Sequence, residues 1–288
     1  MKLALIGVGL IGGSAAAAWR RAGAVTHVTG FDLDARASER GRALGILDAT
    51  ASNVADAVRA ADLVLLAVPV RAMRQVLEQV AAAAPAHALI TDVGSTKASV
   101  VADARAALGA ACSRFVPGHP IAGRELPGVE QASATLFQRR VVVLTPPGET
   151  DAPARERVQA LWEQAGARVV TMAPDVHDRV FAAVSHLPHL LAFALVAAIA
   201  SETDADQKLG FAGAGFRDFT RIAASSPAMW RDVCLANRDA LSEELQRYRA
   251  LLDELQRAVD AGDAATLERT FALASETRRA RAPVLDAE

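Results

Sequence analysis

The chain has 288 residues, 52% hydrophobic and 22% charged, which suits roughly two domains of about 100–200 residues with large cores. Its formal net charge is −2 without a basic tail, which argues against nucleic acid, and Cys112 and Cys234 form neither a disulfide framework nor a zinc-spaced cluster. The cysteine spacing therefore predicts no metal site. The longest apolar stretch, residues 187–200, is shorter than a membrane span, and no signal peptide precedes the first strand pattern. We therefore expect a cytoplasmic protein with no membrane partner.

The first fourteen residues have the order of a strand, a glycine turn and a helix. The apolar run Leu3–Ile6 leads into Gly7, Gly9 and Gly12, and an alanine-rich run follows. In a dinucleotide-binding turn the first glycine permits a tight bend, the second lets the backbone approach a pyrophosphate, and the third lets the helix pack against the strand. We therefore expect a cofactor contact from Gly7, Gly9, Leu10, Ile11 and Gly12.

A second strand pattern ends at Asp32, 20 residues after Gly12, where such folds place the acid that binds the adenine ribose. Its charge would repel a 2′-phosphate, so NAD is the expected cofactor, while Arg36 nearby leaves NADP possible. A further strand pattern ends at Val68 and Pro69, which we also expect beside the cofactor.

Residues 1–172 alternate strand and helix patterns, and several strands are continuous apolar runs, as parallel strands covered on both faces are. The predicted fold is an α/β, Rossmann-like, doubly wound and mostly parallel sheet. Residues 173–288 contain only helical patterns and form the predicted second domain. Pro188 should kink or interrupt a long helix over 174–200. The large apolar surface of this half predicts a homodimer, and a monomer with mutually covering helices is the alternative.

Two segments of the first half can carry chemistry. Ser95, in Asp-Val-Gly-Ser-Thr-Lys (92–97), follows a strand and either caps the next helix or presents its hydroxyl to the site. His119, in Gly-His-Pro-Ile-Ala-Gly (118–123), is expected on a rigid loop after a strand and is a candidate general base, although a lone histidine is often structural.

Two more segments lie in the helical half. Ser-His-Leu-Pro-His (185–189) places two imidazoles on one helical face, which favours substrate binding or packing at the domain junction over metal binding. Arg217 and Arg221 are four residues apart, so one helical face carries two guanidiniums, which suit the binding of a carboxylate. The apolar residues around them, Trp230 among them, favour a semi-buried pocket over a solvated basic face.

Taken together and in this order, the motifs resemble the prephenate/arogenate (cyclohexadienyl) dehydrogenases of tyrosine biosynthesis, over residues 1 to about 235. The resemblance implies a nucleotide-binding domain and a helical dimerisation domain. It implies that His119 is the catalytic base, that Ser95 orients it, and that Arg221 binds a substrate carboxylate. It further implies pocket roles for His189, Arg217, Asp218, Glu125 and Trp230. Arg124 departs from the pattern, because a small residue is common there, and adds a cation near the pocket.

The implied reaction is an NAD-dependent oxidative decarboxylation of prephenate, arogenate or both. Two alternatives stay open. A β-hydroxyacid-type dehydrogenase needs a catalytic lysine in its helical half, where Lys208 is the only lysine. A non-catalytic NAD-sensing protein would keep the glycines and Asp32 but would not need Ser95, His119 and Arg221.

Overall fold

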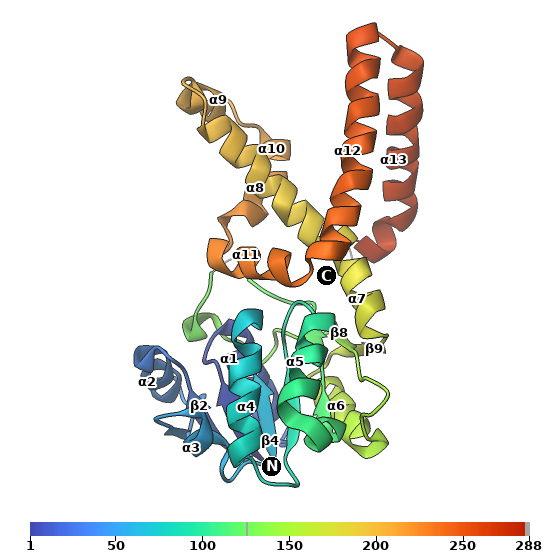
Figure 1. Cartoon of the computed structure of the whole chain (residues 1–288). Helices are drawn as coiled ribbons and strands as arrows, with labels where there is room; N and C mark the ends of the chain where they lie inside the picture. Colours follow the sequence, from blue (N-terminus) through green and yellow to red (C-terminus); the bar gives the residue numbers. More distant parts are fainter. Residues whose placement is uncertain (125, 286–288) are drawn as a thin grey trace. The chain divides into compact units, whose positions relative to one another are not determined.

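The computed structural model describes residues 1–124 and 126–285 (Figure 1). Its contacts divide the chain into two compact units, Met1–Arg238 and the part from Asp239 onward, which are described separately. The first unit holds the sheets and most of the helices. The predicted domain boundary between residues 172 and 173 lies inside the first unit, and it stays a prediction.

The main sheet is parallel, with the strand order β3-β2-β1-β4-β5-β6 of a dinucleotide-binding fold. Its order reverses between β1 and β4, and in such sheets ligands bind at the carboxyl ends of the strands at this point. The strands are β1 Lys2–Ile6, β2 His27–Phe31, β3 Ala49–Thr50, β4 Leu63–Leu66, β5 Leu89–Asp92 and β6 Phe115–Val116.

Helices cover both faces of this sheet (Figure 1). Side chains of β1 alternate between two buried clusters, with Leu3 and Leu5 beside Trp19 on one face and Ala4 and Ile6 on the other. The helical elements of this part are α1 Leu10–Arg21, α2 Ala35–Ala43, α3 Val54–Val58, η1 Val70–Ala72, α4 Met73–Ala83, α5 Ala98–Leu108, η2 Gly109–Arg114, η3 Val129–Gln131 and α6 Ala152–Gln164. The predicted fold class is confirmed, but β3 and α3 are too short to show a periodic pattern and were not predicted.

A second, three-stranded sheet follows, with β7 Gly118–Pro120 antiparallel to β8 Val141–Leu144, which pairs in parallel with β9 Arg168–Thr171. The expectation that His119 lies on a loop was wrong, because it sits on β7 opposite Val143. The residue before a proline is biased toward extended backbone, and Pro120, which lacks an N–H, is tolerated because β7 is an edge strand.

The remainder of the first unit is helical: α7 Pro174–Phe181, η4 Ala182–His186, α8 Leu187–Ala200, α9 Ala205–Gly210, α10 Ala214–Thr220, η5 Arg221–Ala224 and α11 Pro227–Ala236. The predicted interruption at Pro188 is confirmed, because η4 is a π-helical turn directly before it. The continuous run Pro174–Ala200 is longer than the apolar stretch seen in the sequence. By length and composition alone it would suffice to cross a membrane, with 28% of its apolar window buried.

The second unit is a helical hairpin. Its first helix, α12, spans Arg238–Ala261 and begins at the last residue of the first unit, and its second helix, α13, spans Ala264–Leu285. Gly262, at φ +63°, occupies the left-handed conformation that joins the two helices. Asp263 Oδ1 accepts a hydrogen bond of 3.1 Å from the backbone N–H of Thr266 and so caps the last helix.

Candidate active site

The glycine turn between β1 and α1 has the geometry of a phosphate cradle. Gly7 has φ +96°, and a Cβ there would lie 2.3 Å from the carbonyl oxygen of Ala67. A Cβ on Gly12 would lie 2.6 Å from the carbonyl oxygen of Gly7, so both positions require glycine. A Cβ on Gly9 would meet no described atom within 4 Å. No described side chain caps the start of α1, so its first N–H groups are available to a phosphate.

Asp32 closes the cradle at the end of β2. Its Oδ2 accepts a 2.8 Å hydrogen bond from the N–H of Val8, inside the glycine turn, and its Oδ1 accepts one of 2.9 Å from Asp34 N–H. The guanidinium of Arg36 is paired with Asp34, its Nε lying 3.1 Å from Oδ1. The carboxylate of Asp32 is therefore fixed beside the turn, and Arg36 is engaged by another acid.

Two further strands end at the same edge. Val68, half-buried, and Pro69, exposed, follow β4, while Leu10 is buried and Ile11 half-buried in the first turn of α1. Asp92 ends β5 and accepts hydrogen bonds from Gly94 N–H at 2.7 Å and Gly118 N–H at 3.2 Å. These bonds hold the loop that carries Ser95 against the strand that carries His119.

His119 belongs to a chain of three hydrogen-bonded side chains. Its Nδ1 lies 2.8 Å from Nε2 of His177, and Nδ1 of His177 lies 2.7 Å from Oδ1 of Asp178. Phe181 packs on both rings, with centroid distances of 4.9 Å to His119 and 4.4 Å to His177. Burial, reinforced by the competing protonation of the neighbouring His177 and by the charge of Lys97, holds the pKa of His119 well below its usual 6.5, so the ring is an unprotonated base at neutral pH.

Ser95 is half-buried on the loop between β5 and α5, and among the described side chains the ring partner of His119 is His177 rather than Ser95. The backbone of Ser95 lies beside His186, whose Nδ1 accepts a 3.0 Å hydrogen bond from Asn237. Burial lowers the pKa of His186 to about 4, against the opposing charge of Asp178. The orienting role of Ser95 stays a prediction.

His189, Trp230 and Arg221 form a second group. The rings of His189 and Trp230 are stacked, with centroids 3.6 Å apart, and Nδ1 of His189 donates to the carbonyl oxygen of Ser185 at 2.9 Å. Burial lowers the pKa of His189, and the nearby charge of Arg221 lowers it further. Nε2 of His189 is thus an acceptor, and the buried indole N–H of Trp230 has no hydrogen-bond partner among the described residues.

The remaining predicted site residues are more peripheral. Arg217 is exposed on α10 and donates to the carbonyl oxygen of Ala212 at 3.1 Å, while α10 ends at Thr220 and Arg221 begins η5. Arg124 and Asp218 are exposed. Glu125 lies outside the described residues.

Three residues at the centre of the site were not assigned from the sequence: His177, Asp178 and Lys97. His177 and Asp178 lie in α7, only a few residues after β9, and this position after a strand was the one feature of the sequence that could have indicated a site role for them. Lys97 is wholly buried, and its Nζ contacts Asp92 Oδ2 at 2.5 Å and the carbonyl oxygen of Gly118 at 2.7 Å.

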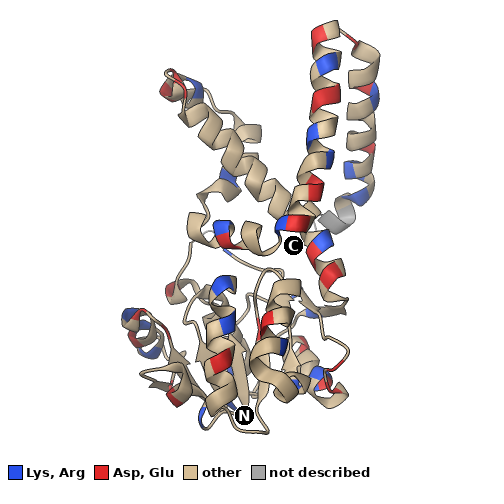
Figure 2. Ribbon diagram, viewed as in Figure 1, with Lys and Arg blue, Asp and Glu red and all other residues tan. Residues whose placement is uncertain are grey.

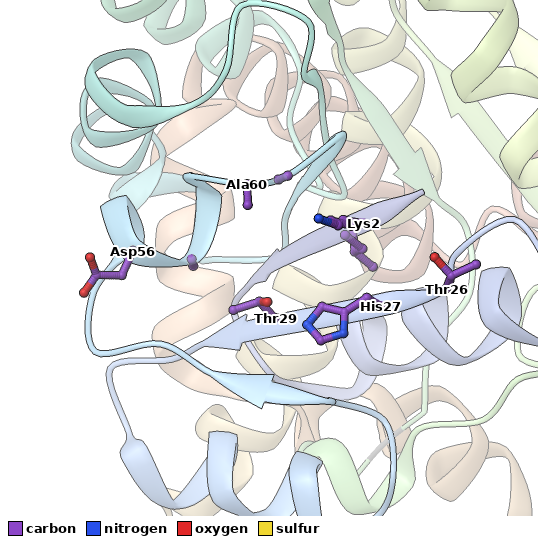
Figure 3. Close-up of a pocket in the computed structure, with 9 residues that line it drawn as sticks. Lys2, Thr26, His27, Thr29, Asp56 and Ala60 are labelled. Atoms are coloured by element: carbon purple, nitrogen blue, oxygen red, sulfur yellow. The ribbon is translucent and has the colours of Figure 1, made fainter.

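A separate hollow of about 400 Å³ lies between β1, β2 and α3 (Figure 3). Lys2 and His27 begin the two strands that line it, so it opens at their amino ends, opposite the edge that carries the glycine turn and Asp92. Its remaining polar lining is Thr26, Thr29 and Asp56. The hollow therefore plays no part in the site built around His119.

Comparison with known proteins agrees with this geometry. Residues 15–171 match the family model of the prephenate dehydrogenase nucleotide-binding domain, and residues 173–273 match that of the prephenate dehydrogenase dimerization domain. The chain is similar to a cyclohexadienyl dehydrogenase of Zymomonas mobilis, at 38% identity over 97% of this chain and 94% of the relative.

Two solved structures are similar over the same length. The prephenate dehydrogenase of A. aeolicus, in complex with hydroxyphenyl propionate and NAD+, is 35% identical with a TM-score of 0.90 and covers 97% of both chains. A Synechocystis arogenate dehydrogenase is 28% identical with a TM-score of 0.80 and covers 97% of this chain and 99% of its own. With its glycine turn, its buried histidine chain and both halves matched, this chain belongs to the prephenate dehydrogenase family.

Proposed function

We propose that this protein catalyses the NAD-dependent oxidative decarboxylation of prephenate, arogenate or both, in tyrosine biosynthesis in the cytoplasm. The observation that carries the proposal is His119, an unprotonated ring held by His177 in the same unit as an open glycine cradle. The resemblance to dehydrogenases named for prephenate, arogenate and cyclohexadienyl substrates gives the substrate class.

The residues fit NAD as the cofactor. Gly7, Gly9 and Gly12, with Leu10 and Ile11, would hold the pyrophosphate at the start of α1, Asp32 would bind the adenine ribose, and Val68, Pro69 and Ser95 would border the remainder. The pairing of Arg36 with Asp34 favours NAD over NADP, since a 2′-phosphate would need that cation and would face Asp32. When bound, the cofactor supplies a hydride acceptor.

His119 accepts the hydroxyl proton of the substrate and later returns it. As a hydride leaves the ring carbon that bears the hydroxyl, Nε2 of His119 takes the hydroxyl proton. The bond to the ring carboxylate then breaks, carbon dioxide leaves, and its electron pair makes the ring aromatic. His119 returns the proton to the oxygen, which becomes a phenol, so the reaction releases no net proton.

The substrate would be bound by Arg221, His189 and Trp230, with Arg217 and Arg124 at the periphery, and Glu125 stays a predicted contact. Arg221 would neutralise a carboxylate. The acceptor Nε2 of His189 and the indole N–H of Trp230, which has no hydrogen-bond partner in the described part of the chain, are suited to polar groups of the substrate. No covalent nucleophile or metal is needed for this chemistry.

We also propose a homodimer formed through the helical half. Helix α8 carries no charged residue (Figure 2), and Leu195 on α8 and Phe211 after α9 are exposed by 38% and 84%. Exposed apolar residues of this extent mark an interaction surface. The amino-terminal half of the run Pro174–Ala200 is hydrogen-bonded to the Rossmann-like part through Asp178, which favours a protein partner over a membrane.

The decisive assay measures the formation of reduced cofactor from prephenate, from arogenate and without substrate: NADH when NAD is supplied and NADPH when NADP is supplied. The proposal predicts NADH from at least one of the two substrates, and production from neither would refute it. The two alternatives are tested in the same assay. Lys208 is exposed and bonded to Glu202, which does not suit a catalytic lysine, and a non-catalytic NAD-binding protein would form no NADH.

A further inference from the structure

The histidine chain contains two residues that the proposed reaction does not itself require. We infer that His177 and Asp178 are positioning residues that fix one tautomer of His119, with the proton on Nδ1 and the lone pair on Nε2. They also stabilise the positive charge of His119 while it carries the substrate proton. This inference rests on the proposed function for its kinetic consequence, but its structural content is independent of the substrate.

Asp178 sets the direction of the whole chain. Its Oδ1 accepts the N–H of Lys97 at 2.8 Å and its Oδ2 accepts the N–H of Ala98 at 2.9 Å, so both oxygens face donors at the start of α5. A carboxylate has only acceptor sites, and the positive end of a helix favours its charged form. Nδ1 of His177, 2.7 Å away, must therefore carry a proton and donate it.

The direction then passes to His119. A neutral His177 that donates through Nδ1 has a lone pair on Nε2, so Nδ1 of His119, 2.8 Å away, must donate to it. Burial lowers the pKa of His177 despite Asp178, which keeps that ring neutral. Nε2 of His119 is left without a proton, as a general base requires. The reverse tautomer would place a proton there and abolish the base.

Charges of both signs surround the pair. Lys97 opposes a positive charge on either ring, whereas Asp178 and Asp92 supply negative charge around His177. When Nε2 of His119 takes the substrate proton, the bond from Nδ1 to His177 becomes charge-assisted, with Asp178 behind it. His177 itself is fully buried and is 58 residues away from His119 in the chain.

The tautomer can be read directly by nitrogen NMR of the full-length protein labelled with ¹⁵N-histidine, because the chain has six histidines. We expect the wild-type His119 signal, identified by its loss in His119→Asn, to show a protonated Nδ1 and an unprotonated Nε2. A protonated Nε2 would overturn the inference. Because this reading needs no substrate, it stands even if the enzyme assay fails.

Measurements of kcat and KM on variants test the kinetic consequence of this tautomer. His177→Phe removes the acceptor, and we expect kcat to fall by about 10²- to 10⁴-fold with little change in KM, since orientation of the base and not binding is lost. His177→Gln, whose amide oxygen can accept from His119, should retain more activity than His177→Phe. Phe181→Leu loosens the packing on both rings but keeps both hydrogen bonds, so it should leave the tautomer unchanged.

Two kinetic results would contradict the inference. One is a wild-type kcat in His177→Phe. The other is an equal loss of kcat in His177→Phe and Phe181→Leu with the same tautomer in both, because packing alone would then explain the effect. If His177→Phe does not fold, two measurements still test the inference. They are the kcat of His177→Gln relative to wild type and the nitrogen spectrum of wild-type His119.

Discussion

Nζ of Lys97 lies 2.5 Å from Oδ2 of Asp92 and 2.7 Å from the carbonyl oxygen of Gly118, and both charged side chains are fully buried. This contact joins the end of β5 to the first residue of β7, and so to the backbone of His119. Burial lowers the pKa of Lys97, and the charge of Asp92 opposes that change.

Lys97→Met should therefore strongly destabilise the protein. Removing one partner of a buried pair leaves an uncompensated charge, which typically costs about 3–5 kcal/mol of unfolding free energy. Urea unfolding of the variant and of wild type measures this difference. Lys208→Met is the matched control, because Lys208 forms an exposed pair with Glu202 and such pairs contribute only about 0–1 kcal/mol. Equal losses in both variants would contradict the assigned role of Lys97.

His119→Asn should lower kcat by about 10²- to 10⁴-fold, the contribution typical of a general base. The asparagine keeps a polar group near His177 but cannot take up a proton. Cofactor binding should be unchanged, because the glycine turn is formed without His119, and titration with NAD would check this. A variant that turns over at nearly the wild-type rate would exclude His119 as the base.

The pH dependence follows from the sign of the shift at His119. The base must be unprotonated, and burial holds its pKa well below 6.5, so kcat/KM should fall only as the pH drops below that value. Because His119 and His177 are coupled, the measured midpoint belongs to the pair. A pH profile of kcat/KM from acid to neutral pH tests this, and a midpoint at 6.5 or above would show that the ring is not held neutral by burial.

Arg221→Ala should raise KM much more than it lowers kcat, if Arg221 holds a substrate carboxylate both before and during the reaction. Steady-state kinetics with the preferred substrate separates the two constants. Arg157→Ala is a suitable control, because Arg157 is exposed on α6 in the nucleotide-binding part. An unchanged KM in Arg221→Ala would remove Arg221 from the proposed site.

Features that depend on local geometry were predictable from the sequence. The turn at Gly7 and Gly12 needs glycine because neighbouring backbone leaves no room for a Cβ, and this requirement appears directly as spacing. The interruption at Pro188 is equally local. The parallel sheet followed from apolar runs that alternate with helices.

The histidine chain was not predictable in the same way. His119 and His177 are 58 residues apart, and Asp178 meets Lys97 across 81 residues, so only the placement of α7 against α5 and β7 brings them together. His119 itself was recognised, but its strand was missed because three residues carry no periodic pattern. The change from α10 to η5 between Arg217 and Arg221 was likewise not visible in their four-residue spacing.

Leu195→Glu should weaken the proposed homodimer. The substitution places a charge on the uncharged surface of α8, and a buried unpaired charge at an interface is costly, so the variant should shift toward monomer. Light scattering coupled to size-exclusion chromatography measures the mass of each species. Leu44→Glu is the matched control, because Leu44 is similarly exposed but lies at the end of α2 in the nucleotide-binding part. A wild-type monomer, or equal effects of the two substitutions, would rule out α8 as the dimer surface.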